Sequence, residues 1–98
     1  MKNIYKYELP LSPGAHKLEL PRGAKILSAG TSPIDPNTPC LWALVNTLSL
    51  ETDTWDIALA FTGDALAEPP FGREWIHLDS FVCLDDLVYH AFVAGIAP

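Results

Sequence analysis

The stretch TWDIALAFT, residues 54 to 62, has the clearest alternation of side chains in the chain. Successive side chains of a β-strand point to opposite faces, so this period of two predicts a strand. The large apolar residues share one face and the small or polar residues share the other. The first set is Trp55, Ile57, Leu59 and Phe61, and the second is Asp56, Ala58, Ala60 and Thr62. The small alanine side chains predict that another layer of structure approaches the second face closely.

Further alternating or apolar runs lie on both sides of this stretch, and nine prolines and six glycines divide them. Short runs separated by frequent turn residues are typical of an all-β sandwich or barrel. The predicted strands are 5–9, 16–20, 25–31, 40–45, 54–62, 75–84 and 87–94, with a turn at Pro21-Arg22-Gly23. We expect one mostly β domain over residues 1–98, a small antiparallel sandwich or barrel-like sheet of about six to seven short strands with little or no helix.

Two of these runs depart from simple alternation. Residues 40–45, CLWALV, are apolar on both faces, which predicts a central strand with core on one side and another element or subunit on the other. Residues 81–94 also fit a helix, because their large apolar residues recur at helical spacing after a capping residue. We prefer strands there, since valine, tyrosine and phenylalanine favour β structure.

Composition restricts the classes of partner. Hydrophobic residues make up 49% of the 98 residues, and charged residues only 18%. Large exposed apolar patches are rare on monomers, so we expect a homo-oligomer. The formal net charge of −6 disfavours nucleic acid and anionic membrane as partners. The start of the chain lacks a signal-peptide pattern, and the two cysteines fit a reducing cytoplasm, so a cytoplasmic protein is expected.

One group of residues could carry chemistry if the last hairpin turns at Asp85-Asp86. That register places His77, Asp79, Cys83 and His90 on one face of the sheet. A cysteine beside a histidine could act as a nucleophile with its base, or the group could bind zinc. A slip of one residue in the register would separate them, and no oxyanion-hole glycine pattern lies nearby. The alternative is that Cys83 is a small core residue. We predict no catalytic residue, no metal site and no cofactor.

A ligand-binding set follows from cations on glycine turns and from aromatic side chains. Backbone N–H groups of such turns can bind a phosphate or carboxylate, and a tryptophan can stack on a planar ligand. The candidate residues are Arg22, Lys25, Trp42, Arg73, Trp75, His77 and His90. Ordinary turns and a packed core are the alternative interpretation for the same residues.

Four blocks of the chain, IYKY at 4–7, ELPRGAKILS at 19–28, PCLWALV at 39–45 and LVYHAF at 87–92, occur in a characteristic order. This pattern resembles a family of short proteins of unknown function from tailed bacteriophages and prophages. The chain departs from that pattern at residues 29–38, where members typically have a shorter polar strand and an Asn-Gly turn. The resemblance implies an accessory phage protein acting in a bacterial host cytoplasm, and it carries no catalytic motif.

Three functions remain open. The first is an oligomeric binding protein that sequesters a small ligand, for example a nucleotide signal of host defence, or blocks a host defence protein. The second is a structural or assembly protein of the virion. The third is a hydrolase that uses Cys83 and His90. The excess of apolar residues favours the first two, because both depend on association.

Overall fold

The computed structural model describes residues 1–10, 12–83 and 86–97 of the chain, and within them it contains seven strands and no helix. The mostly β prediction is therefore confirmed. The strands are β1 (Lys2–Glu8), β2 (Gly14–Pro21), β3 (Lys25–Thr31), β4 (Pro39–Asn46), β5 (Thr52–Phe61), β6 (Ile76–Val82) and β7 (Val88–Ile96). The described residues accordingly hold no helix long and apolar enough to cross a membrane.

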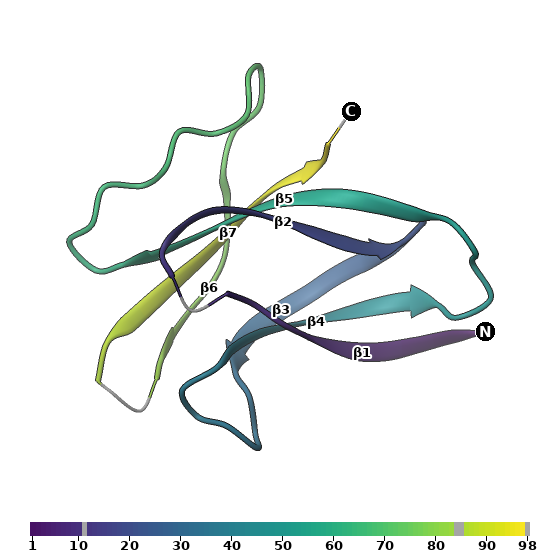
Figure 1. Ribbon diagram of the computed structural model, residues 1–98, viewed down its shortest axis with the longest axis horizontal. Helices are drawn as coiled ribbons and strands as arrows, with labels where there is room; N and C mark the ends of the chain where they lie inside the picture. The colour runs from purple at the N-terminus through teal and green to yellow at the C-terminus, as the bar shows by residue number, and fades with distance from the viewer. Residues whose placement is uncertain (11, 84–85, 98) are drawn as a thin grey trace.

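The strands form two antiparallel sheets that share one core (Figure 1). The first has the order β1-β4-β3 and the second has the order β2-β5-β7-β6. The buried core residues come from both sheets, as a sandwich requires. They are Leu9, Leu20, Leu41, Ala43, Val45, Ile57, Leu59, Cys83, Tyr89 and Ala91.

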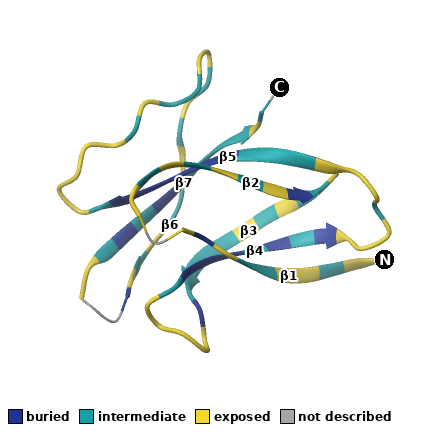
Figure 2. Cartoon of the chain, in the orientation of Figure 1, coloured by how far each residue is buried: buried dark blue, intermediate teal, exposed yellow. Residues whose placement is uncertain are grey.

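β4 is the central strand of the first sheet, as its apolar sequence predicts. Leu41, Ala43 and Val45 are buried in the core, and the burial of this strand is visible in Figure 2. Trp42 and Leu44 point to the opposite face and are only half-buried. The chain therefore covers the outer side of this strand less completely than its inner side.

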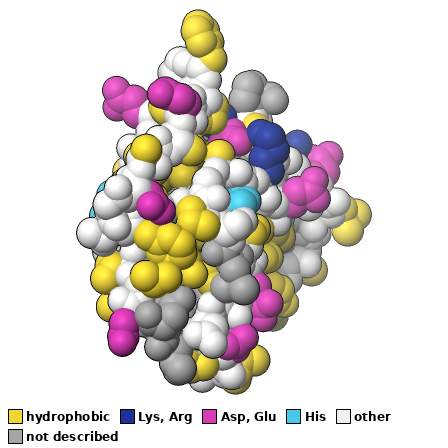
Figure 3. Space-filling view, turned by 60° about the vertical axis from the view of Figure 1, so that its left-hand side comes forward, with side chains coloured by type: hydrophobic (Ala, Val, Ile, Leu, Met, Phe, Trp, Pro, Cys, Tyr) yellow, Lys and Arg dark blue, Asp and Glu magenta, His cyan; other side chains and the backbone are white. Residues whose placement is uncertain are grey.

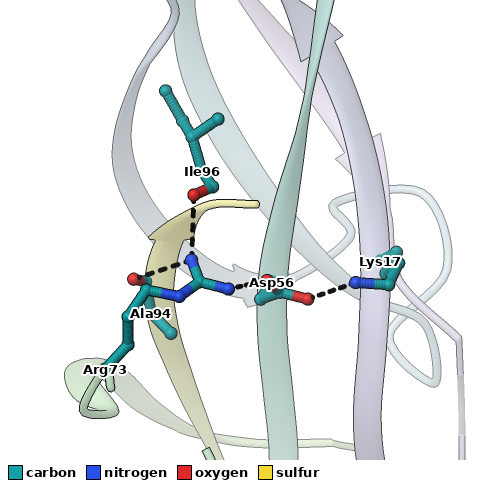
Figure 4. A network of polar contacts seen from close by, with 5 residues as sticks. All are labelled: Lys17, Asp56, Arg73, Ala94 and Ile96. Atoms are coloured by element: carbon teal, nitrogen blue, oxygen red, sulfur yellow. Dashed lines mark hydrogen bonds and ion pairs between the residues drawn. The ribbon is translucent and has the colours of Figure 1, made fainter. Parts of the chain in front are cut away.

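β5 is covered on both faces, so the layer expected over its alanines is supplied by the chain itself. Ile57 and Leu59 belong to the core, while Asp56, Ala58 and Ala60 are buried on the other face. The segment between β5 and β6 reaches that face, because the Arg73 guanidinium donates to the Asp56 carboxylate (Figure 4).

One side of the sandwich is joined by a polar contact between strands at the edges of the two sheets. β3 and β6 lie beside each other. The backbone N–H of Ala29 in β3 donates to Asp79 Oδ2 in β6 over 2.9 Å. This bond satisfies an edge N–H that has no strand partner on that side.

The chain after residue 87 is a strand, and the helical alternative is wrong. In β7, Tyr89 and Ala91 are buried in the core and alternate with His90 and Phe92, which lie on the outer face. β7 pairs with β5 on one side and with β6 on the other, so its side chains alternate with the period of a strand and not with that of a helix. The turn at Pro21-Arg22-Gly23 is confirmed: Ala24 N–H donates to Pro21 O, and Gly23 has a φ of 85°.

Candidate functional site

The outer face of the β1-β4-β3 sheet carries a group of basic and apolar side chains. Residues directly opposite in neighbouring strands share a face. Leu44 is opposite Ile4 in β1 and Lys25 in β3, and Trp42 is opposite Lys6. Lys2 lies on the same face at the start of β1. We call this surface the lysine face, consisting of Lys2, Ile4, Lys6, Lys25, Trp42 and Leu44.

Aromatic and aliphatic groups occupy the middle of the lysine face. The Trp42 ring lies over Gly30 of β3, where an added Cβ would stand 3.5 Å from ring atom Cζ3. An alanine at position 30 would make an ordinary van der Waals contact with the ring. Ile4 is 61% exposed, although it is a large apolar residue. The face therefore presents open apolar area between its lysines.

The other lysine and arginine side chains of the protein are engaged with carboxylates. Arg22 pairs with Glu51 and Asp53, and Lys17 and Arg73 both pair with Asp56. By contrast, none of the three lysines of the lysine face forms an ion pair within the described residues.

The electrostatic character of this face is therefore opposite to that of the whole chain. Lys6 donates to the neutral Ser32 hydroxyl over 3.2 Å, and one carboxylate, Glu8, lies at the end of β1 on the same face. Three lysines share this surface with Glu8, and the Asp35 carboxylate lies near its Cys40 end, in a chain whose net charge is −6. Unpaired cations of this kind attract acidic groups, and that attraction is screened by salt.

Arg73 and Trp75, two of the predicted ligand-binding residues, stabilise the segment between β5 and β6. Arg73 donates to Asp56, to Ile96 O over 2.9 Å and to Ala94 O over 3.3 Å (Figure 4). Trp75 Nε1 donates to Ala67 O over 2.6 Å. Both residues belong to the segment that packs on the β2-β5-β7-β6 sheet, whereas Lys25 and Trp42 lie on the β1-β4-β3 sheet, so the four residues do not form one ligand site.

His77 and His90 lie together on the outer face of the β6–β7 pair, in a chain of hydrogen bonds. His77 Nε2 is 2.8 Å from Ser80 Oγ, and Ser80 Oγ is 2.7 Å from His90 Nδ1. His90 Nε2 is in turn 2.7 Å from Thr62 Oγ1. The described residues hold no group of three or more His, Cys, Asp or Glu side chains that could share a metal ion.

The hypothetical group of Cys83 with His90 is not formed, because the register differs by one residue from the assumed one. Ser80 is opposite His90, and Val82 is opposite Val88. Cys83 is buried in the core, on the other side of the sheet from His90. The assumed turn includes residues 84 and 85, which lie outside the described residues.

Asp79 is also separated from the two histidines. A β-bulge between His77 and Asp79 shifts the pairing, so that Asp79 is opposite Ala91, a core residue. The Asp79 carboxylate is bonded to the Ala29 N–H of β3. The arrangement of nucleophile, base and orienting carboxylate that the hydrolase hypothesis needs is therefore absent from these four residues.

Both cysteines are expected to resist alkylation in the native protein. Cys40 and Cys83 are buried, and burial raises the pKa of the Cys40 thiol, which lowers its thiolate fraction. With iodoacetamide at pH 7.5, labelling should be at least about a hundredfold slower than in the unfolded chain, because it requires opening of the structure. Mass spectrometry of both peptides measures the rates. Rapid native labelling of Cys83 would contradict its placement in the core.

A second surface, on the side of the segment between β5 and β6, is mainly apolar. Hydrophobic side chains gather there next to a histidine (Figure 3). Leu66, Phe71, Ile76, Val82 and Leu87 are exposed large apolar residues of this part of the chain. Unlike the lysine face, the surface offers no charge pattern that would identify what covers it.

Two of the seven predicted residues, Lys25 and Trp42, thus meet on the lysine face, and two others, His77 and His90, meet on β6–β7. The prediction missed Lys2, Ile4 and Lys6, as well as Ser80 between the histidines. The signal for the first three was present: they alternate with Asn3 and Tyr5, so they share one face of a strand.

Comparison with known proteins gives one match. No curated protein and no solved structure matches the chain. The model of a domain of unknown function, DUF7352, matches residues 1–96, nearly the entire sequence. The chain belongs to the DUF7352 family.

Proposed function

We propose that this protein is a non-enzymatic binding protein, and that its lysine face binds an acidic protein surface that also carries apolar side chains. The observation that carries the proposal is the segregation of charge. Three lysines that form no ion pair with any described residue surround Trp42, Ile4 and Leu44 on one sheet face, in a chain with a net charge of −6. Complementary charge steers a partner to such a face, and a central aromatic residue supplies much of the binding energy.

The shape of the surface favours a macromolecule over a small ligand. Small-molecule sites are concave and enclose most of their ligand. The described residues contain no pocket, and the lysine face is the outer side of a three-stranded sheet. A nucleotide or another small anion is therefore the less supported occupant of a single chain.

The resemblance to phage and prophage proteins suggests the setting in which the partner occurs. We propose a host protein in the bacterial cytoplasm, such as a component of host defence, as the target that this accessory protein blocks. A structural role in the virion makes a different prediction, because the protein would then be present in purified particles. Its absence from particles would support the binding role.

Backbone and indole NMR of the protein, titrated with an acidic peptide of alternating glutamate and leucine, tests the proposal. Amide shifts are expected in β1, β3 and β4, together with a shift of the Trp42 indole N–H. Binding should weaken strongly at about 0.5 M salt, where charges are screened within a few ångströms. A peptide of alternating lysine and leucine should not bind.

Two neighbouring cations provide a matched pair of variants. Lys25→Gln should weaken binding of the acidic peptide about three- to tenfold, because an interfacial charge is lost. Arg22→Gln removes the same charge only three residues away, from a side chain already paired with Glu51 and Asp53, and should leave the affinity unchanged. Equal effects of the two substitutions would contradict the proposal, as would shifts confined to β6 and β7. Preferential binding of oligo(dT) or of a nucleotide to the same face would replace the protein partner with a nucleic acid or a small anion.

A further inference from the structure

β1 has a free edge, one without a strand partner among the described residues. β1 is at the end of its sheet, and β4 is the strand that it pairs with. Leu9 N–H donates to Pro39 O at one end of this pairing, and Thr47 N–H donates to Met1 O at the other. In an antiparallel pair, alternate residues bond to the same neighbour. The odd-numbered residues of β1 therefore bond to β4, and the even-numbered ones direct their N–H and C=O groups to the free edge.

A second copy of the same strand complements this edge. When two β1 strands pair antiparallel about a twofold axis at Tyr5, the whole of Lys2–Glu8 is paired. Lys2 then lies opposite Glu8 of the second copy, and this ion pair occurs twice. Ile4 lies opposite Lys6. All these residues are even-numbered, so each pair exchanges the backbone hydrogen bonds that the free edge offers.

Two neighbouring registers also pair the even-numbered residues with each other, but both are expected to be less stable. A twofold axis at Ile4 would place Lys2 opposite Lys6 of the second copy. An axis at Lys6 would place two Lys6 side chains opposite each other. Like charges directly opposite are destabilising in a sheet, whereas opposite charges stabilise it. The charge order of β1 thus selects the register that also pairs the greatest length of strand.

We propose that two copies of this protein associate through their β1 edges, so that two three-stranded sheets become one continuous sheet. The contact is isologous and closed, which is the commonest symmetry of homo-oligomers. Tyr5 and Ile4, which are 47% and 61% exposed in the single chain, lie beside the second copy's strand, and the outer face of each sheet stays open. This inference does not depend on the proposed function, although the dimer would place two lysine faces side by side and allow bivalent binding.

Charge exchange between Lys2 and Glu8 tests the proposal by sedimentation velocity over a wide range of protein concentration. The unmodified protein should form a dimer. Glu8→Lys places lysine opposite lysine at both ends and should raise the dimer Kd about tenfold or more. The double variant Lys2→Glu with Glu8→Lys restores the opposite charges and should restore the dimer. Far-ultraviolet circular dichroism of each variant reports whether the fold is retained.

Another variant removes a backbone hydrogen bond between the two β1 strands and keeps their charges. Ile4→Pro deletes an N–H that points to the free edge, so the pairing with β4 is kept and dimerisation is expected to be lost. An unmodified protein that stays monomeric at millimolar concentration would overturn the proposal. So would a folded Glu8→Lys variant that dimerises normally, or a folded double variant that remains monomeric. These results concern the edge alone, whereas failure of the acidic-peptide titration concerns the lysine face.

Discussion

Replacing Leu20 with alanine is expected to lower the free energy of unfolding by about 3 to 4 kcal/mol. Leu20 of β2 is completely buried in the core that the two sheets share. The truncation removes favourable burial and leaves a cavity that the close-packed surroundings fill only in part. Small domains have a stability of roughly 5 to 15 kcal/mol, so a loss of this size is a large share of the total. Urea denaturation followed by circular dichroism measures it.

Leu50 provides the matched control for this substitution. It lies just before β5 and is 99% exposed. Leu50→Ala removes the same atoms without opening a cavity, so the change should stay within about 0.5 kcal/mol. Similar losses for Leu20→Ala and Leu50→Ala would contradict the position of the core.

Asp56→Asn is expected to destabilise the protein by about 2 to 3 kcal/mol at pH 7. The Asp56 side chain is only 8% exposed and accepts hydrogen bonds from Lys17 Nζ, over 2.7 Å, and from Arg73. The Arg73 side chain is itself 22% exposed, so loss of the carboxylate leaves a cation that is largely removed from water. Lys17 is 66% exposed, and its share of the loss is small because solvent screens it.

The same substitution should change the dependence of stability on pH. The hydrogen bond from Lys17, supported by the Arg73 contacts and opposed by burial, lowers the pKa of Asp56 in the folded protein. A carboxyl whose pKa is lowered on folding adds stability above its unfolded pKa of about 3.9, and that stability is lost as the pH falls through the folded value. The difference between native protein and Asp56→Asn should therefore shrink below about pH 4.

Glu19→Gln is the control for the loss of a carboxylate. Glu19 lies on the neighbouring strand β2 and is exposed, so its replacement should change stability little at any pH. Urea denaturation at pH 7 and pH 3 compares the variants. A destabilisation by Asp56→Asn that is the same at both pH values would show that the charge of Asp56 does not contribute.

The strands could be predicted from sequence because a period of two and frequent turn residues leave few alternatives. The predicted third strand, 25–31, has the bounds of β3, and the other strands differ from prediction by a few residues at their ends. The central position of β4 followed from its continuous apolar run. Helical spacing in 81–94 was misleading, because a short apolar run fits both periods.

Pairing registers were not predictable, and the candidate site depends on them. Each of three strand pairs contains a register shift, at Ile26/Ser28, Asp56/Ile57 and His77/Asp79. The second shift is marked in the sequence by Gly95, which has a φ of 97° beside it, whereas the other two stretches contain no glycine or proline. Through the last of them His77 shares a face with Ser80 and His90, while Asp79 turns toward β3. A shift of one residue was enough to separate Cys83 from His90 and to place Ser80 between the two histidines instead.

The lysine face could be anticipated only in part. Lys25 and Trp42 were selected for their residue types, but nothing in the sequence says that β1 and β3 flank β4 on opposite sides. That order brings Lys6 and Lys25 to the same surface from positions far apart in the chain. The pairing of β2 with β5 in the other sheet distinguishes Lys25 from Arg22, whose charge is neutralised by carboxylates at the start of β5 and just before it.

Lysine acetylation footprinting with the acidic peptide present and absent tests the role of the lysine face most directly. Mass spectrometry reports the modification rate of each lysine in one experiment. Lys2, Lys6 and Lys25 should be protected by the peptide, while Lys17, held by Asp56 on the other sheet, should react at an unchanged rate. Protection of Lys17 alone, or equal rates for all four lysines with and without peptide, would contradict binding at this face.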